Sequence, residues 1–178
     1  MDWETLYQPW RASCDNSDGR RKSIEAEVRA AVKSGGYDGL AWDLEALPGG
    51  SLEHASRAHF IRVIVRHDNR MPDAFLAPLV RAAIYERDPS FNRHFVEPCL
   101  RCFGLRRTND ELLRYATAGS DFEKAGAANA FYWSLRARLE GKPVPGADAL
   151  DGLSSRVRDW RLTEFVSNPD VSVRRVPS

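Results

Sequence analysis

The sequence predicts an all-α protein with a single domain, and three observations carry that prediction. Apolar residues recur at helical spacing, as Ile24, Val28 and Ala31 do. Capping signatures precede several of these stretches, the clearest being Ser120 with Glu123. Glycine and proline separate one stretch from the next. A chain of 178 residues has room for one domain with a sizeable core.

Composition and charge narrow the class of protein. Charged residues make up 29% of the chain and hydrophobic residues 43%, as in folded globular proteins. The formal net charge of +1 argues against an electrostatic hold of the whole protein on nucleic acid or an anionic membrane. We see no secretory signal and no apolar run long enough to span a bilayer. The odd number of cysteines, three, argues against a disulfide framework, so we expect a cytoplasmic protein.

The first third of the chain is expected to hold an anchoring segment and three helices. Residues 1–21 combine aromatic residues with a polar stretch, which predicts an N-terminal docking segment and a loop. Helices are expected over 22–33 and 38–47, each followed by glycines. Ser51 is expected to cap a helix over 52–67, although the β-branched residues of its second half also suit a strand.

The middle of the chain predicts two helices joined by a tight turn. Asp73 can cap a helix that runs to residue 86, with Pro78 kinking its interior. Asp88, Pro89 and Ser90 predict the turn. The second helix is expected over 91–103, kinked at its proline and stopped by a glycine.

The last third predicts three more helices. They are a helix capped by Thr108 and Glu111 and ended by Gly119, a long helix over 120–138, and, after a loop over 140–152, a helix over 153–165. The long helix has a waist of small residues, namely Ala125, Gly126, Ala127, Ala128 and Ala130. Because these residues have little side-chain bulk, neighbouring helices can approach closely, and we expect this helix in the middle of a stack.

Acidic residues recur where the second helix of each expected pair begins. They are Asp88, Asp121 and Asp170, at separations of 33 and 49, and each precedes a basic residue. The segment 168–175, Asn-Pro-Asp-Val-Ser-Val-Arg-Arg, resembles the turn and second helix of HEAT-type α-solenoid repeats. The resemblance is clearest over 73–175 and implies a HEAT-like helical array over 22–178, in which each repeat stacks on its neighbour.

One mixed face of the long helix is a candidate binding surface. In armadillo solenoids, which are related to HEAT arrays, a Trp and an Asn one turn apart line the concave surface and bind a peptide. Asn129 and Trp133 resemble this pair in reversed order. The predicted binding residues are Asn92, Arg93, Glu97, Asn129, Trp133 and Arg136. The alternative is that Asn129 bonds a buried loop carbonyl and Trp133 fills space between repeats.

Signatures of catalysis and metal binding are largely missing from the sequence. It holds no dinucleotide fingerprint, phosphate loop or nucleophile elbow. Cys99 and Cys102 have the spacing of a metal or redox pair, but we expect them to pack in the core. We expect structural roles for the histidines and no cofactor or metal. The histidines are His54, His59, His67 and His94.

The function that these patterns favour is a non-catalytic scaffold that binds a protein or peptide partner on its concave helical surface. A nucleic-acid-binding protein is the first alternative, because some HEAT-like proteins excise damaged bases; Trp133, Asp121 and the arginine clusters supply suitable residue types. An immunity or antitoxin-like subunit is another. Apolar surface around Trp160 and Phe165 at the last repeat suggests dimerisation as a further hypothesis.

Overall fold

The computed structural model describes residues 3–13, 20–35, 50–65, 71–139, 151–167 and 169. These residues form helices and turns with no strand among them, which confirms the all-α class. In chain order the elements are α1 (Glu4–Ser13), α2 (Arg20–Gly35), α3 (Leu52–Val65), the 3-10 turn η1 (Asp73–Phe75), α4 (Leu76–Tyr85), α5 (Arg93–Ala118), α6 (Asp121–Leu139) and α7 (Asp151–Ser167). None of these helices is both long enough and apolar enough to cross a membrane.

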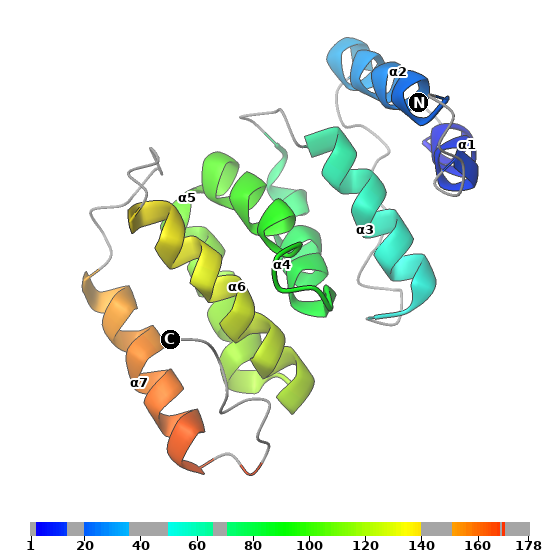
Figure 1. The fold of residues 1–178 in the computed structure, drawn as a ribbon. Helices are drawn as coiled ribbons and strands as arrows, with labels where there is room; N and C mark the ends of the chain where they lie inside the picture. Colours follow the sequence, from blue (N-terminus) through cyan, green and yellow to red (C-terminus); the bar gives the residue numbers. More distant parts are fainter. Residues whose placement is uncertain are drawn as a thin grey trace.

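The helices follow one another along the molecule, from α1 and α2 at one end to α7 at the other (Figure 1). The middle is formed by α4, α5 and α6, which pack closely against one another. The helix α3 joins this group through α4 and α5, and α1 and α2 pack on α3. Buried apolar residues of all these helices form one continuous hydrophobic core.

The small residues of α6 bring it directly against α4. Gly126, Ala127, Ala128 and Ala130 are all buried. A Cβ atom added to Gly126 would overlap the backbone carbonyl group of Ile84 in α4. The predicted waist of small residues therefore lies at a close helix contact in the middle of the stack, as expected.

The capping box predicted at the start of α6 is present. The Ser120 N–H donates to Glu123 Oε2 at 2.8 Å, and the Glu123 N–H donates to Ser120 Oγ at 3.4 Å. The hydroxyl of Tyr85 in α4 donates to Glu123 Oε1 at 2.8 Å. Burial alone would raise the pKa of Glu123, but the hydrogen bonds from Ser120 and Tyr85 together lower it. The Glu123 carboxylate thus helps to cap the start of α6 and links α6 to α4.

Gly104 divides α5 into two helical halves. Its φ of 79° and ψ of 166° lie outside the helical region and suit glycine. The predicted end of a helix at Gly104 is confirmed, but the capping box predicted at Thr108 is wrong. The second half restarts directly after Gly104, so Thr108 lies inside it and its Oγ1 donates to the Gly104 carbonyl at 2.8 Å. Glu111 pairs with Arg114 at 2.8 Å instead of capping.

The start of α4 also differs from the prediction. Asp73 begins η1, whose cap position is Pro72, and no side chain caps this turn. The Asp73 carboxylate accepts a hydrogen bond from Arg107 at 2.9 Å, and this ion pair lowers the pKa of Asp73. Pro78 is the third residue of α4. It therefore lies in the first turn, where a missing N–H costs little, and not in a helix interior.

The helix α3 begins directly after its predicted capping residue, Ser51, and remains helical as far as Val65. Ser51 Oγ accepts a hydrogen bond from the His54 N–H at 3.1 Å, so the predicted cap is confirmed. The β-branched residues of its second half, from Ile61 to Val65, are helical and not a strand. Their burial in the core explains the outcome, because tertiary packing outweighs the weak strand preference of such residues.

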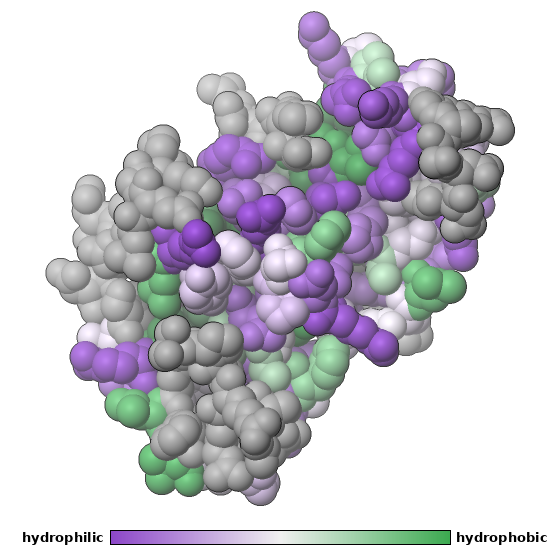
Figure 2. Space-filling model, in the orientation of Figure 1, coloured by the Kyte–Doolittle hydropathy of each residue, from purple (hydrophilic) through white to green (hydrophobic). Residues whose placement is uncertain are grey.

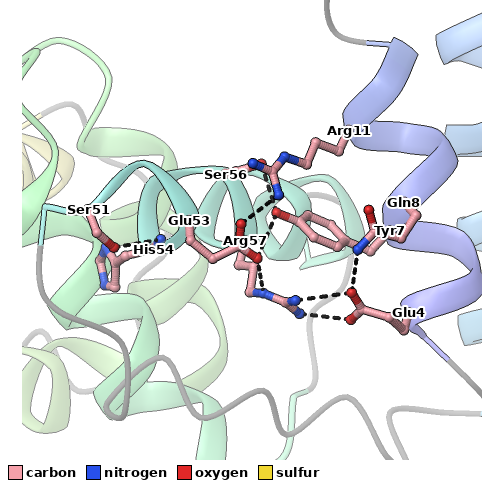
Figure 3. A network of polar contacts seen from close by, with 9 residues as sticks. All are labelled: Glu4, Tyr7, Gln8, Arg11, Ser51, Glu53, His54, Ser56 and Arg57. Carbon is pink, nitrogen blue, oxygen red and sulfur yellow. Dashed lines mark hydrogen bonds and ion pairs between the residues drawn. The ribbon is translucent and has the colours of Figure 1, made fainter.

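Aromatic residues anchor α1 on the rest of the molecule, as expected for a docking segment. Trp3, Tyr7 and Trp10 are at most 2% exposed. Polar contacts from α3 add to this anchor (Figure 3). Arg57 donates to both carboxylate oxygens of Glu4 at 2.9 and 3.1 Å, and its guanidinium lies 4.5 Å from the Tyr7 ring centroid.

The helix α7 covers the stack beyond α6. Val157 and Trp160 are buried, and the Trp160 ring lies 6.0 Å from that of Phe131 in α6. Trp160 itself is therefore not part of an exposed apolar surface. Among the α7 side chains that the structure describes, Leu162 and Val166 are apolar and exposed, at 57% and 81%.

The two cysteines of α5 pack as predicted. Cys99 is fully buried, and burial raises the pKa of its thiol. Cys102 is partly buried against the core. A thiol held protonated in an apolar site is chemically inert, so Cys99 serves packing.

Several predicted features lie outside the described residues. They are Cys14, the helix expected over 38–47, His67, the side chain of Phe165, the loop over 140–150, and the repeat segment 168–175 apart from Pro169.

Candidate functional site

The predicted binding residues lie where the start of α5 meets the second half of α6. Trp133 of α6 is half-buried there. Its Nε1 donates to the backbone carbonyl of Pro89 at 2.7 Å, across the turn that precedes α5. This hydrogen bond holds the indole against the turn in one orientation.

The turn that receives this hydrogen bond, residues 88–90, is stabilised by hydrogen bonds of its own. Asp88 Oδ1 accepts from the Ser90 N–H at 2.8 Å and from the Ser90 hydroxyl at 2.6 Å. These bonds lower the pKa of Asp88. The Phe91 N–H donates to the Asp88 carbonyl at 2.9 Å, and Pro89 fixes its own φ. The turn predicted over residues 88–90 is therefore confirmed.

Two arginines and a tyrosine surround the Trp133 ring. The Cζ atoms of Arg93 and Arg136 lie 5.7 and 5.5 Å from its centroid, within the range of cation–π interactions. The Tyr132 ring lies 5.0 Å from it at an interplanar angle of 80°, and Arg136 Nη1 donates to the Tyr132 hydroxyl at 3.1 Å. We call Arg93, Tyr132, Trp133 and Arg136 the Trp133 cluster.

The Trp133 cluster combines aromatic rings with positive charge. A guanidinium keeps its charge and offers only donors, in a fork that matches a carboxylate. Comparison of the chain with protein-family models, curated proteins and solved structures gives no match.

The residue types of the Trp133 cluster are common at binding surfaces. Tryptophan, tyrosine and arginine are the residue types that most often carry the affinity of protein interfaces. Residues of these types can bind an acidic or an apolar group.

The structure brings three of the six predicted binding residues together, namely Arg93, Trp133 and Arg136. Asn92 is only 1% exposed, so its amide lies beneath this surface, where it has no hydrogen-bond partner among the described residues. Asn129 is half-buried one turn before Trp133, and Glu97 is half-buried one turn after Arg93. The alternative, in which Asn129 bonds a buried loop carbonyl and Trp133 fills space between repeats, stays a prediction for Asn129. Trp133 does pack against the core, and it also bonds the Pro89 carbonyl.

Tyr132 is the residue of the Trp133 cluster that the sequence patterns do not single out. It is 36% exposed and precedes Arg136 by four residues, the spacing at which helix side chains meet. The spacing of four residues between Tyr132 and Arg136 is the feature of the sequence that could have identified Tyr132 as a member of the site. Phe91 was also not singled out; it is 37% exposed and lies 5.4 Å from the Arg62 Cζ atom. Aromatic rings beside arginines therefore lie on both flanks of the same turn.

The histidines near this turn make protein contacts. His59 Nε2 lies 3.2 Å from Glu86 Oε2. His54 packs edge-on against the Tyr85 ring, with centroids 5.6 Å apart. Within the described ranges, no group of three or more His, Cys, Asp and Glu side chains is placed to hold a metal ion.

Proposed function

We propose that the protein is a non-catalytic binding module that holds a protein or peptide partner on the face formed by α5 and α6. The observation that carries the proposal is the Trp133 cluster. Hydrogen bonds hold Trp133, Tyr132 and Arg136 in place before a partner arrives, and Arg93 lies over the Trp133 ring. Groups fixed in advance lose little conformational freedom on binding, which favours affinity. A HEAT-like stack supports this function, because such arrays present extended faces to their partners.

The chemistry of the Trp133 cluster suits a partner segment that carries a carboxylate next to an apolar side chain. The guanidinium groups of Arg93 and Arg136 can pair with the carboxylate, and the Tyr132 and Trp133 rings can cover the apolar group. On the side of the molecule drawn in Figure 2, the coloured residues are mostly hydrophilic, and the hydrophobic ones form separate small patches. A surface of this kind suits a few anchoring contacts better than one broad apolar interface.

Capture from a lysate with matched charge variants tests the proposal. The tagged wild-type chain is compared with the variant R93A/R136A and with the control R106A/R158A. Arg106 and Arg158 have side chains that are 77% and 69% exposed, so the control removes the same charge elsewhere. Washing at low and then high salt separates specific protein partners from weak electrostatic binding.

We expect the wild type and the control to retain one stoichiometric protein at high salt, and R93A/R136A to retain at least tenfold less. Circular dichroism checks that the wild type and both variants are folded. Equal capture by R93A/R136A, or no retained protein, would contradict the proposal.

Nucleic acid is the second candidate partner, because a base can stack on an aromatic ring beside arginines. The same eluates distinguish the two classes. Single-stranded nucleic acid that binds at low salt, leaves as salt rises, and is lost from R93A/R136A would favour this alternative. A single tightly retained protein would also suit a subunit that neutralises one partner, as an immunity protein does.

A further inference from the structure

One face of α6 carries side chains that the rest of the chain does not bury. Its members, in helix order, are Phe122, Ala125, Asn129, Trp133 and Arg136, and each is exposed or half-buried. Successive members are three or four residues apart, so they lie in one line along the helix. We call these five residues the α6 stripe. Its last two members also belong to the Trp133 cluster.

The spacing of the α6 stripe reads the same in both directions. The intervals are 3, 4, 4 and 3 residues, from 122 to 125, 129, 133 and 136, so Asn129 is the centre. Two copies of α6 that lie antiparallel and meet at Asn129 would place Phe122 opposite Arg136 of the second copy. They would also place Ala125 opposite Trp133 of the second copy. A pair of this kind has a twofold axis, the commonest symmetry of protein dimers.

The side chains that this pairing places opposite each other are complementary. Phe122 is 52% exposed, and its ring can accept the Arg136 guanidinium as the Trp133 ring does within one chain. The small Ala125 side chain leaves room for an indole, and large residues pack well opposite small ones. The Asn129 amide both donates and accepts, so two such amides can hydrogen-bond to each other at the axis.

Charge favours the antiparallel orientation over the parallel one. The first turn of α6 holds Asp121 and Glu123, and Arg136 lies near the other end of the helix. An antiparallel pair brings Asp121 of each copy close to Arg136 of the other, whereas a parallel pair brings like charges together. Asp121 and Phe122 are also a carboxylate next to an apolar side chain, which is the partner chemistry that suits the Trp133 cluster.

We propose that the partner of the Trp133 cluster is a second copy of this chain, and that the two copies meet through antiparallel α6 stripes. The inference rests on the proposed function, because it names the partner of that same site. The stripe is only roughly 20 Å long, so the contact is smaller than the roughly 800 Å² per partner of a standard interface. The dimer should therefore form reversibly, at micromolar concentrations of the chain.

Sedimentation velocity of the full chain over a series of concentrations tests the proposal. We expect the wild type to pass from monomer to dimer as its concentration rises. The variants D121R and R136E each place like charges opposite each other at both ends of the pair, so we expect each alone to dimerise at least tenfold more weakly. The control R106E changes the charge of an arginine of α5 whose side chain is 77% exposed, and it should dimerise like the wild type.

A mixture of D121R and R136E gives the sharpest test of the antiparallel pairing. In a mixed pair, Arg at position 121 of one copy meets Glu at position 136 of the other. The native Asp121 and Arg136 meet at the second contact. Opposite charges are thus restored at both ends, so we expect the mixture to dimerise like the wild type.

Heteronuclear NMR of the wild type at low and high concentration locates the contact without a variant. We expect concentration-dependent shifts along the α6 stripe, including the Trp133 Nε1–H signal. We expect none at Leu162 and Val166, the exposed apolar residues of α7. In a lysate that contains untagged copies of the chain, the protein that the tagged wild type retains would then be the chain itself.

Three results would overturn the proposal: a wild type that stays monomeric at every concentration, a mixture that dimerises no better than D121R or R136E alone, or concentration-dependent shifts that lie outside the α6 stripe. The first and third need no variant, so the test holds even if a variant fails to fold. A monomeric wild type that still retains a different protein through Arg93 and Arg136 would overturn this inference and leave the proposed function standing.

Discussion

At the scale of single residues, Gly126 leaves no room for a Cβ atom. Replacing Gly126 by Ala should improve helix propensity by about 1 kcal/mol, but the new Cβ overlaps the Ile84 carbonyl group. Backbone cannot move aside as a flexible side chain can. We therefore expect the free energy of unfolding to fall by about 1–3 kcal/mol, as in other overpacked cores. Urea denaturation followed by circular dichroism measures this free energy. A variant more stable than the wild type would contradict the prediction, because it would show that α4 and α6 can move apart to admit the Cβ atom without losing stability.

Two histidines should make stability depend on pH. Burial, followed by the charge of Arg81, lowers the pKa of His54. Burial, followed by the charge of Arg62, lowers the pKa of His59, although Glu86 opposes this. A lowered pKa in the folded state means that the unfolded chain binds more protons below pH about 6.5. The folded state should therefore lose stability as pH falls through this value.

Urea midpoints at intervals between pH 7.5 and 5 measure this dependence. The cost is about 1.4 kcal/mol for each unit by which the two states differ in pKa. The window avoids the lowered carboxylates Asp73, Asp88 and Glu123, which titrate at lower pH. We expect a shallower slope in H54F than in the wild type. Identical slopes would contradict the role of His54.

At the scale of elements, the attachment of α1 depends on Arg57. Its side chain is 17% exposed and pairs with Glu4 and with Glu53, so its removal takes an ion-pair partner from Glu4 and leaves Glu53 with Arg11. We expect Arg57→Ala to lower the free energy of unfolding by about 1–3 kcal/mol, between the values for surface and buried pairs. The matched control is Arg29→Ala in α2, which loses only an exposed pair with Glu25.

Limited proteolysis separates loss of the α1 attachment from a general loss of stability. In Arg57→Ala we expect faster cleavage within α1 than in the wild type, because its contacts with α3 are weakened. The control Arg29→Ala should be cleaved like the wild type. Equal cleavage of all three proteins would contradict the prediction and would show that the buried aromatic residues hold α1 in place without Arg57.

Local capping signals predicted two helix starts correctly and two wrongly. Ser51 and Ser120 cap as expected because each is followed directly by helix and preceded by non-helical chain. Thr108 carries the same kind of signature and fails, because the chain is already helical before it. A capping pattern does not report the conformation of the preceding residues, and that conformation decides whether the pattern is used.

The candidate site was predicted only in part, for a physical reason. Trp133 and Arg136 could be grouped because helix periodicity places them on one face of α6, and Arg93 was added because the HEAT-like repeat pattern stacks its helix beside that one. The burial of Asn92 depends on how the preceding turn packs, and no local pattern encodes that. A pocket lined by Ala55 and Ala58 of α3 and Ala82 of α4 depends on how these two helices stack, so its alanines look ordinary in the sequence. Helix periodicity does not predict contacts between segments that are far apart in the sequence, and these contacts form the rest of the site.

At the scale of the whole molecule, stability should differ between its middle and its ends. The helices α4, α5 and α6 each pack against both others, whereas α7 packs mainly on α5 and also contacts α6. We expect native-state hydrogen exchange to be slowest in α4–α6 and faster in α1, α2 and α7, through smaller openings. Mass spectrometry of exchanged peptides at low urea measures this. Equal protection of α7 and α5 would indicate a single cooperative unit.

The contact between α4 and α6 also has an evolutionary consequence. Ser120 and Glu123 begin α6, Glu123 binds Tyr85, and Gly126 makes room for the α4 backbone one turn later. Selection for this contact acts on all of these positions at once, so a change at one is tolerated only with changes at others. Descendants of the same ancestor should therefore retain the spacing Ser-x-x-Glu-x-x-Gly after an aromatic donor, even where the rest of the sequence has diverged.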